Sequence, residues 1–455
     1  MDHEATGGRI VADDEEYIRS TIPLWHNELR GFRSHVVLRW ALTVLGLAVF
    51  ILTALSIFSG ALYLTETKLS SLTIWIVDFD SLIPPYDSLD AVIGPLVTEM
   101  IMTQSSQTMG GLNFVTRPPI NFQNNPMAVR QKVYNEDAYA AIIINANATS
   151  SLQESIAFKD ASYDPLGAAQ IIYNSARDET TYYNYIIPTL NQLKQVALDG
   201  FGPRWIEILT KNGLTNISNV PPQALNPAIG FTEIDLRPFG PAVATPAVSI
   251  GLIYLIIISF FAFPFLIPIH SQLTLNKKHR PVKASHMIIW RLFSNFVVYL
   301  ILSFFYSLVP LAFQIPFTNS PEPAMEPARN ANAYGKSSFV VYWMLNWIGM
   351  AALGLPSENM AMILGAPWSA LWLTFWVISN VSTGFYPLNL ASNFYKWGYV
   401  WPLHRIVEGS RTILFGTYSR IGLDFGVLLG WIGVSIILFP VATAFLGWKS
   451  TRLIA

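Results

Sequence analysis

The stretch WALTVLGLAVFILTALSIFSGALYL, from Trp40 to Leu64, contains no charged residue. A helix needs about 20 consecutive, mostly apolar residues to cross the hydrocarbon of a bilayer, so this stretch is long enough. A removable signal peptide would lie close to the N-terminus and would end in a small-residue cleavage pattern. Here 39 residues come first, and no such pattern follows directly. We therefore predict an uncleaved transmembrane helix over residues 40–64.

Five further apolar stretches lie in the second half of the chain. Their approximate ranges are 241–269, 292–317, 338–355, 360–387 and 425–448. They explain why the 455-residue chain is 52% hydrophobic and only 13% charged, whereas ordinary soluble domains carry about 25% charged residues. We predict a polytopic α-helical membrane protein in contact with the lipid bilayer. It would have six transmembrane helices, one before and five after an inserted domain, within a block over residues 241–448.

Residues 65–240 differ in composition and form the inserted domain of this prediction. Runs rich in β-branched and aromatic residues, such as Leu72 to Phe79 and Tyr139 to Ile144, alternate with runs of helical periodicity. Alternating strands and helices indicate a small α/β domain. Two N-glycosylation tripeptides begin at Asn147 and Asn216. We therefore expect an extracytosolic domain that carries glycans.

The positions of Lys and Arg in short flanking segments predict the orientation in the membrane. The N-terminal tail (1–39) with five arginines, the loop after the second span and the C-terminal tail (449–455) carry Lys and Arg and lie on one side of a six-span chain. We expect this side, and with it both termini, to be cytosolic. Four basic residues between the last two spans oppose this orientation, namely Lys396, Arg405, Arg411 and Arg420.

Several classes of function are disfavoured by what the sequence lacks. The net charge of −1 provides no basic excess to bind nucleic acid by counterion release. Without cysteine the chain has no thiolate metal site, and its seven histidines lack H-x-x-x-H spacing. Neither G-x-x-x-x-G-K-[ST] nor G-x-G-x-x-G after a strand occurs. We expect no cofactor, no metal, no nucleic-acid partner and no ATPase activity of the chain itself.

Asp78 and Asp80 end the first predicted strand of the inserted domain, in the run DFDSLIPPYDSLD. Such a D-x-D pair can hold a divalent cation against a nucleotide-sugar diphosphate, which would make the protein an anchored glycosyltransferase. Alternatively, these carboxylates lie at a strand end and turn, with Asp87 or Ser88 capping the next helix. No base or phosphate-binding loop accompanies the pair, so we favour the structural interpretation and expect no enzyme.

A second polar feature lies in residues 388–422, which we expect to rest at the outer membrane interface. In Pro402 to Gly416 (PLHRIVEGSRTILFG), His404, Glu408 and Arg411 recur at i, i+4 and i+7 and share one helical face. The functional interpretation is a gate or a surface facing a substrate. The structural alternative is an ion pair between Glu408 and Arg411 that only settles the helix.

The predicted spans themselves contain few ionisable residues. We expect Arg291, Glu358 and Asp424 at span ends, where snorkelling and helix-dipole effects accommodate charge. Proton relays usually need carboxylates or histidines inside the membrane. The sequence therefore argues against a transporter driven by protons.

The chain resembles the fungal nitrosoguanidine-resistance membrane proteins, a family related to bacterial phage-infection proteins and, more distantly, to the permease halves of type 2 ABC exporters. The similar features are a single anchor span and four segments: WIVDFD (Trp75 to Asp80), IGPLVTEMI (Ile93 to Ile101), AYAAIIINANATSSL (Ala138 to Leu152) and P-x-H-R-x-x-E-G-x-R-x-x-L-F-G (from Pro402). The resemblance extends from about Val36 to Trp448.

This resemblance implies a permease-like protein that contributes to resistance to toxic small molecules, by export or by altering the membrane barrier. It implies a location in the plasma membrane, or else in another endomembrane. We expect a homodimer, and the loop from Ser271 to Met287 could receive a separate partner ATPase. The alternative is a protein that transports nothing and regulates lipid organisation or binds a partner through its extracytosolic domain.

Overall fold

The computed structural model describes residues 22–107, 111–212, 220–275, 280 and 282–454. The predicted glycosylation site Asn216 and part of the loop expected to receive an ATPase lie outside these residues. The chain divides into two compact units, residues 1–56 and 57–455. The first unit contains η1 (Asn27–Leu29) and most of α2 (Arg30–Ala61), whose last turn belongs to the second unit. Its Trp40, Leu45 and Leu52 are 60 to 71% exposed, as expected for side chains that face lipid.

Five helical segments of the described residues are long and apolar enough to cross a membrane. They are Asn27–Ala61, Ala242–Leu273, Ala284–Ala312, Gly335–Leu364 and Ile421–Lys449. They correspond to α2, α10 (Ile253–Leu275) with the short elements before it, α11 (Ala284–Ala312), α12 (Ser338–Leu364) and α15 (Ile421–Ile454). The chain is thus a mostly helical, polytopic membrane protein.

The predicted count of six spans is not confirmed. We expected one span to end near residue 355 and the next to begin near residue 360. Instead α12 continues through Pro356 to Leu364, and Gly365, at φ +70°, ends it. The next helix, α13 (Trp368–Gly384), has 17 residues. At 1.5 Å per residue it is about 25 Å long, against about 30 Å of hydrocarbon.

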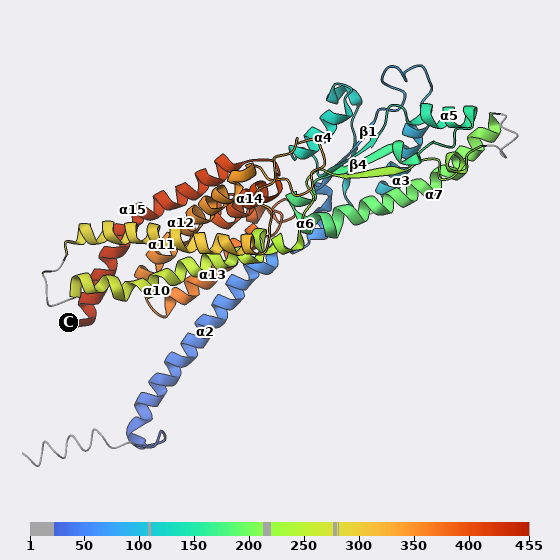
Figure 1. Ribbon diagram of the computed structural model, residues 1–455. Helices are drawn as coiled ribbons and strands as arrows, with labels where there is room; N and C mark the ends of the chain where they lie inside the picture. The colour runs from blue at the N-terminus through green and yellow to red at the C-terminus, as the bar shows by residue number, and fades with distance from the viewer. Residues whose placement is uncertain (1–21, 108–110, 213–219, 276–279, 281, 455) are drawn as a thin grey trace, which may run out of the picture. The chain divides into compact units, whose positions relative to one another are not determined.

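Among the described residues of the second unit, five short strands form one mixed sheet (Figure 1). They are β1 (Thr73–Asp78), β2 (Asn113–Thr116), β3 (Ala140–Ile144), β4 (Ala169–Tyr173) and β5 (Phe231–Asp235), in the order β2-β1-β3-β4-β5. Only the pairing of β3 with β4 is antiparallel. Residues 72–236, which contain this sheet, are called the sheet domain below. The α/β character predicted for this part of the chain is present, although the sheet is small.

Alternation along the strands gives the sheet two buried faces. On β3, Ile142 and Ile144 lie in one apolar core, whereas Ala141 and Ile143 lie in the other. Helices α3 (Ile93–Gln107), α5 (Ala148–Phe158) and α7 (Ile187–Lys211) contribute to the first core, and α4 (Pro126–Tyr134) contributes to the second. Successive side chains of a strand point to opposite faces of the sheet. A strand that is covered on both faces therefore needs a continuous apolar run such as AAIII.

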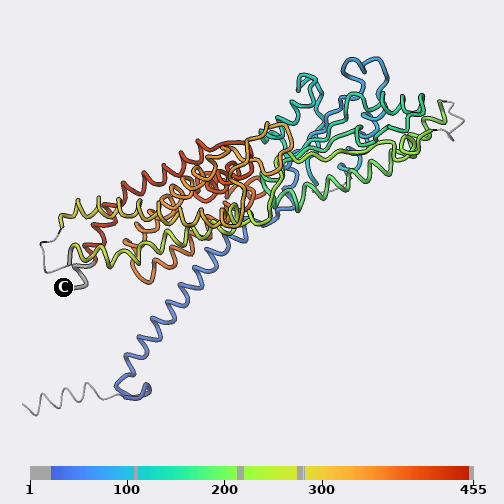
Figure 2. The backbone as a smooth tube through the Cα atoms, in the orientation of Figure 1, coloured from blue at the N-terminus to red at the C-terminus, as the bar shows by residue number. Residues whose placement is uncertain are grey.

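Residues 242–454, called the helical block below, are organised around α12. This helix packs against α10, α11, α13, α14 (Pro402–Phe415) and α15, and the backbone trace shows these helices alongside one another (Figure 2). Small residues permit the close approach. A Cβ on Gly349 would lie 2.7 Å from Ile406 of α14, and one on Gly354 would touch the hydroxyl of Tyr299.

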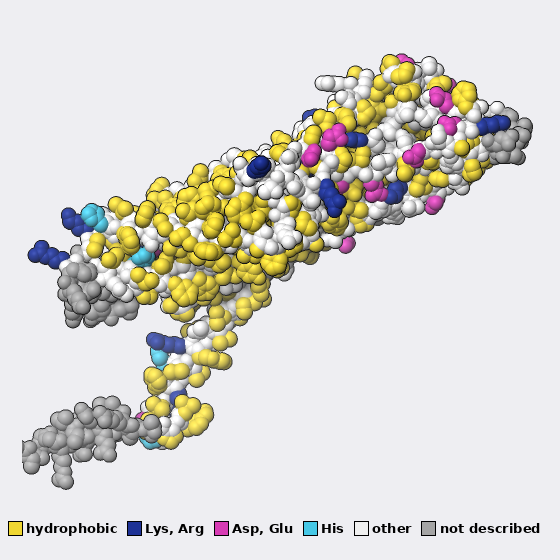
Figure 3. Space-filling view, in the orientation of Figure 1, with side chains coloured by type: hydrophobic (Ala, Val, Ile, Leu, Met, Phe, Trp, Pro, Cys, Tyr) yellow, Lys and Arg dark blue, Asp and Glu magenta, His cyan; other side chains and the backbone are white. Residues whose placement is uncertain are grey.

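The surface of the second unit reflects the same division. On the face shown in Figure 3, hydrophobic side chains cover the helical block, while Asp and Glu side chains gather over the sheet domain. An apolar outer surface is what helices in lipid require, since lipid tails are as apolar as the side chains themselves.

Candidate functional site

Helix α14 carries the polar residues predicted as a gate. Pro402 occupies its first turn, where the missing N–H costs nothing, and Gly416 ends it at φ +66°. Its apolar face, including Ile406, Ile413 and Leu414, is buried in the core of the helical block. The opposite face is therefore directed away from that core, towards the sheet domain.

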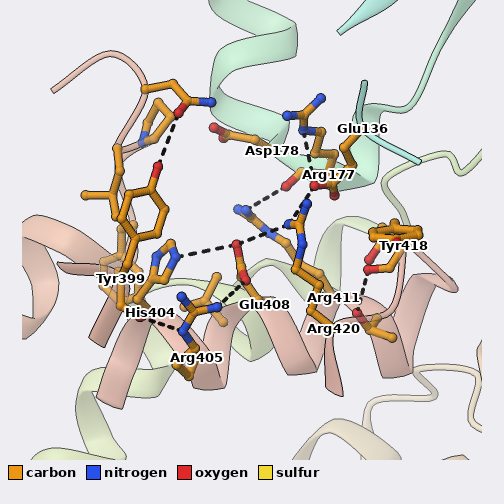
Figure 4. A pocket seen from close by; sticks show the side chains of 18 of the residues that line it. Glu136, Arg177, Asp178, Tyr399, His404, Arg405, Glu408, Arg411, Tyr418 and Arg420 are labelled. Atoms are coloured by element: carbon orange, nitrogen blue, oxygen red, sulfur yellow. Dashed lines mark hydrogen bonds and ion pairs between the residues drawn. The ribbon is translucent and has the colours of Figure 1, made fainter. Parts of the chain in front are cut away.

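A pocket of about 390 Å³ lies between this face and the sheet domain (Figure 4). The sheet domain contributes Glu136, Tyr139, Arg177 and Asp178 to its wall. The helical block contributes α14, the segment 384–389 and residues 417–423, including His404, Arg405, Glu408, Arg411 and Arg420. The three predicted gate residues thus share one pocket with charged residues from a distant part of the sequence.

The ion pair between Glu408 and Arg411 that formed the structural alternative is absent from the described residues, where each of the two has another partner. Arg405 Nη1 donates to Glu408 Oε2 over 3.0 Å, and Arg411 Nη2 donates to Glu179 Oε2 over 2.7 Å. Arg411 Nη1 also donates to the carbonyl of Arg177, at 2.8 Å. The sheet domain thus supplies partners for Arg411 that no local helical spacing could indicate.

A second ion pair joins the two parts of this unit. Arg420 Nη1 lies 2.8 Å from Glu136 Oε2, and Arg177 lies with its guanidinium 3.9 Å from the ring centre of Tyr139. Arg405, besides its bond to Glu408, lies 3.4 Å from Asp424. Three of the four basic residues that opposed the predicted orientation are therefore each paired with a carboxylate.

His404 and Glu408 form a site that can hold a proton. His404 Nδ1 is 3.1 Å from the carbonyl oxygen of Thr383, so we assign the ring proton to Nδ1. The other nitrogen, Nε2, lies 3.4 Å from Glu408 Oε1. Burial lowers the pKa of His404 below its usual value, although the charge of Glu408 opposes this shift. Without a proton, His404 Nε2 and Glu408 Oε1 are two acceptors that face each other. A proton on Nε2 would make it a donor to Oε1.

Asp78 and Asp80 lie at the end of β1, as predicted, and Asp80 anchors two helices. The buried Asp80 carboxylate accepts hydrogen bonds from the backbone N–H of Gly94 in α3 and of Thr149 in α5, each at 2.9 Å. The Thr149 hydroxyl also donates to it, over 2.6 Å. Neither Asp87 nor Ser88 has this role, because Asp80 is the carboxylate that reaches both helix N-termini.

Asp78 lies beside this anchor. Its Oδ1 accepts from the backbone N–H of Asp80, and a Cβ on Gly94 would lie 2.1 Å from that oxygen, so only glycine fits there. Burial raises the pKa of Asp78 to about 6. Among the described residues, His, Asp and Glu side chains form no cluster that could hold a metal ion.

Asn147, the other predicted glycosylation site, lies at the start of α5. Its Nδ2 donates to Ser151 Oγ over 3.1 Å. The Thr149 hydroxyl of the same tripeptide is buried and bonded to Asp80. Because the folded domain covers that hydroxyl, glycan addition to Asn147 would have to precede folding; the glycosylation itself stays a prediction.

The placement of Arg291 and Glu358 differs from our expectation. Both were expected at span ends, yet each side chain is only 4% exposed and they form an ion pair between α11 and α12. The apolar interior predicted for the helical block therefore contains a buried pair of charges. The sequence did not reveal it, because the boundary proposed near residue 355 placed Glu358 outside the span.

The family model described as "Protein of unknown function (DUF3533)" matches residues 43–437. The chain belongs to this family. It is also 27% identical over 449 residues to the uncharacterized endoplasmic reticulum membrane protein YJR015W of Saccharomyces cerevisiae, covering 94% of this chain and 84% of the relative. No solved structure matches.

These matches support an integral membrane protein. Their descriptions name neither nitrosoguanidine resistance nor ABC exporters, and the yeast relative belongs to the endoplasmic reticulum rather than the plasma membrane.

Proposed function

We propose that this protein is a permease-like membrane protein that lowers the exposure of the cell to toxic small molecules, and that the pocket on α14 receives the molecule. The supporting observation is that the wall of this 390 Å³ pocket comes from both the sheet domain and the helical block. A ligand there would touch both parts at once, so its binding could change how they are held together.

The pocket suits a small polar molecule. Its volume falls in the range of about 300 to 1,000 Å³ that is typical of ligand sites. Four arginines and three carboxylates line it, so donors and acceptors are both present and nearly balanced. A ligand with both kinds of group could replace protein partners with its own, which a purely apolar molecule could not do.

Binding of a ligand would change the conformation by breaking ion pairs between the sheet domain and the helical block. Arg411–Glu179 and Arg420–Glu136 both connect the sheet domain to the helical block. When a ligand takes over some of these bonds, the remaining contacts hold the two parts less tightly. Because α14 packs on α12, displacement of α14 would reach the centre of the helical block.

We further propose that α13 is a sixth crossing and that both termini face the cytosol, which places the sheet domain and the pocket on the opposite side. The location of the yeast relative favours the endoplasmic reticulum membrane. In that case toxic molecules would move between the cytosol and the lumen.

The test is the flux of a radiolabelled nitrosoguanidine in cells with and without the protein. We expect cells that lack it to retain more label, and Glu408→Gln to resemble the absence of the protein at equal expression. The control is Glu99→Gln, because Glu99 lies on an exposed part of α3 with a 60% exposed side chain. Unchanged flux together with an altered lipid distribution would refute the permease and favour a regulator of lipid organisation.

A further inference from the structure

Glu358 and Arg291 form an ion pair inside the helical block, away from the pocket. Arg291 Nη2 of α11 donates to Glu358 Oε1 of α12, and Asn295 Nδ2 of α11 donates to Glu358 Oε2. Both carboxylate oxygens therefore have a donor from the neighbouring helix. The pair lies nine residues, or about 14 Å, along α12 from Gly349, the contact point of α14.

The surroundings of the pair are apolar. The Arg291 guanidinium lies 5.9 Å from the ring centre of Phe263 and 5.0 Å from that of Phe439, and its Nη1 contacts the sulfur of Met362 at 3.2 Å. Removal of two charges from water costs several kcal/mol per ion, and well-packed apolar residues often stabilise a core equally well. Intramembrane charges are accordingly a sign of function more than of stability.

The pair is also incompletely satisfied. Only one nitrogen of Arg291 reaches the carboxylate, and its buried Nε has no hydrogen-bond partner among the described residues. On α10, the buried His270 accepts at Nδ1 from Trp290, while its Nε2 also has no hydrogen-bond partner in the described part of the chain. An ion pair that only stabilises the fold would be expected to be bidentate, with two nitrogens of Arg291 bonded to the carboxylate.

Arg291 and Glu358 both lie near helix ends, so their ion pair can separate. Arg291 is seven residues from the start of α11 and Glu358 six from the end of α12, about 9 to 11 Å from the helix ends. A released arginine can extend its side chain to the interface from this depth. Pro356, two residues before Glu358, lacks the N–H that would bond to the carbonyl of Ala352, so α12 can bend there.

We propose that Glu358 is a proton-binding site within the membrane, and that its protonation breaks the ion pair with Arg291 and drives the permease cycle. This inference rests on the function proposed above and adds its energy source. One proton from water forms an O–H bond on the carboxylate, and no electrons are transferred. Arg291 keeps its proton, loses its counterion and moves to water, which shifts α11 against α12.

Other titratable or charged groups surround the site. Tyr299 of α11 is buried one turn beyond Asn295, and His270 of α10 lies within reach of the charge of Arg291. From α15, Lys449 Nζ donates to the carbonyl of Leu364 at the end of α12, at 3.0 Å. The pair Arg291–Glu358 is the direct contact between opposite charges in this group.

Infrared difference spectroscopy tests proton binding without a transported substrate. The full-length protein in lipid nanodiscs is measured at a series of pH values. We expect acidification to produce carbonyl bands of buried protonated carboxyl groups, one of which is absent in Glu358→Gln and present in Glu99→Gln. The band of Asp78, whose pKa is raised by burial, should remain in both variants. Asn295→Ala, which keeps the carboxyl group of Glu358, should shift the midpoint of the Glu358 band to higher pH because the charged form loses a donor. Bands unchanged in both Glu358→Gln and Asn295→Ala would overturn the proposal.

A second measurement separates coupling from transport. Proteoliposomes release a radiolabelled nitrosoguanidine with and without a pH gradient. We expect the pH gradient to accelerate release by the wild type. Release by Glu358→Gln should have the same rate with and without the gradient. Release by the wild type that also ignores the gradient would overturn proton coupling and leave the permease intact. No release beyond that of protein-free vesicles would refute both.

Discussion

Arg411 of α14 donates to Glu179 of the sheet domain over 2.7 Å, although 232 residues separate the two in sequence. Their side chains are only 12% and 13% exposed. This contact and Arg420–Glu136 join the sheet domain to the helical block at the pocket in which we propose that a ligand binds. The strength of these two ion pairs therefore determines how tightly the sheet domain and the helical block are held together.

The first prediction concerns this link. Arg411→Gln should lower the free energy of unfolding by roughly 3 kcal/mol, because it leaves Glu179 as an uncompensated, largely buried charge. Thermal unfolding of the protein in nanodiscs measures the effect. The double variant with Glu179→Gln should recover part of the loss.

The exposed pair Arg204–Glu99 provides the matched control. Its side chains are 48% and 60% exposed and its separation is 3.4 Å. Arg204→Gln should change stability by less than about 1 kcal/mol. Equal losses for Arg411→Gln and Arg204→Gln would show that the link across the pocket is no stronger than a surface contact.

Asp80→Asn should destabilise the sheet domain by about 2 to 4 kcal/mol. The amide nitrogen would face backbone donors of α3 and α5, and the negative charge at both helix N-termini would be lost. Chemical denaturation followed by circular dichroism measures this loss. Asp87→Asn, at an exposed position, should have no effect. If Asp80→Asn were as stable as the parent, Asp80 would not be the anchor, and its two oxygens would be free for another role.

The raised pKa of Asp78 predicts a pH dependence of stability. The usual value is 3.8 and the folded value about 6, so the folded protein binds this proton more tightly than the unfolded chain. The resulting stability is present below pH 3.8 and is lost as the pH rises to about 6. Above that range Asp78 costs about 2 to 3 kcal/mol.

Asp78→Asn keeps the acceptor for the N–H of Asp80 and removes this cost. We expect the variant to be more stable than the parent at pH 7.5 and to lose that advantage at pH 4, in parallel unfolding experiments. A constant difference between the two proteins over this range would contradict the raised pKa.

Arg237 should fix the connection between α11 and α12. Its guanidinium donates to the carbonyl oxygens of Glu322, Pro323 and Glu326 in this connection, and to that of Gly416 after α14, at 2.8 to 3.1 Å. Lysine cannot reproduce this fork of donors.

Hydrogen exchange measures the consequence. In Arg237→Lys, the amides of residues 313–334 should exchange at least tenfold faster than in the parent, whereas the exposed Arg329→Lys should leave them unchanged. Unchanged exchange in Arg237→Lys would mean that other contacts hold the connection.

Local patterns in the sequence predicted much of the architecture. The charge-free run from Trp40 and the alternation of strands and helices in residues 65–240 required no knowledge of distant contacts. The boundary predicted between the fourth and fifth spans, near residues 355–360, was wrong, because α12 continues through Pro356 to Leu364. Inside a helix bundle, however, neighbouring helices can support a proline.

The site was predictable only in part. The shared face of His404, Glu408 and Arg411 follows from helical spacing, and these residues do line one pocket. Glu136, Glu179 and Arg177 come from the sheet domain, and their approach depends on tertiary structure that no local pattern encodes. The one signal for it was indirect. The predicted orientation placed several arginines where the orientation rule disfavours them, and such charges need carboxylate partners.

The pocket can be tested directly, because the chain has no cysteine and an introduced pair is therefore unique. A variant with Glu136→Cys and Arg420→Cys, reconstituted in vesicles loaded with a radiolabelled nitrosoguanidine, can be joined across the pocket by a cleavable bismaleimide. We predict that release of the label stops on cross-linking and resumes on cleavage, while each single-cysteine variant is unaffected by the reagent. Release that continues at the same rate in the cross-linked protein would contradict a transport role for this pocket.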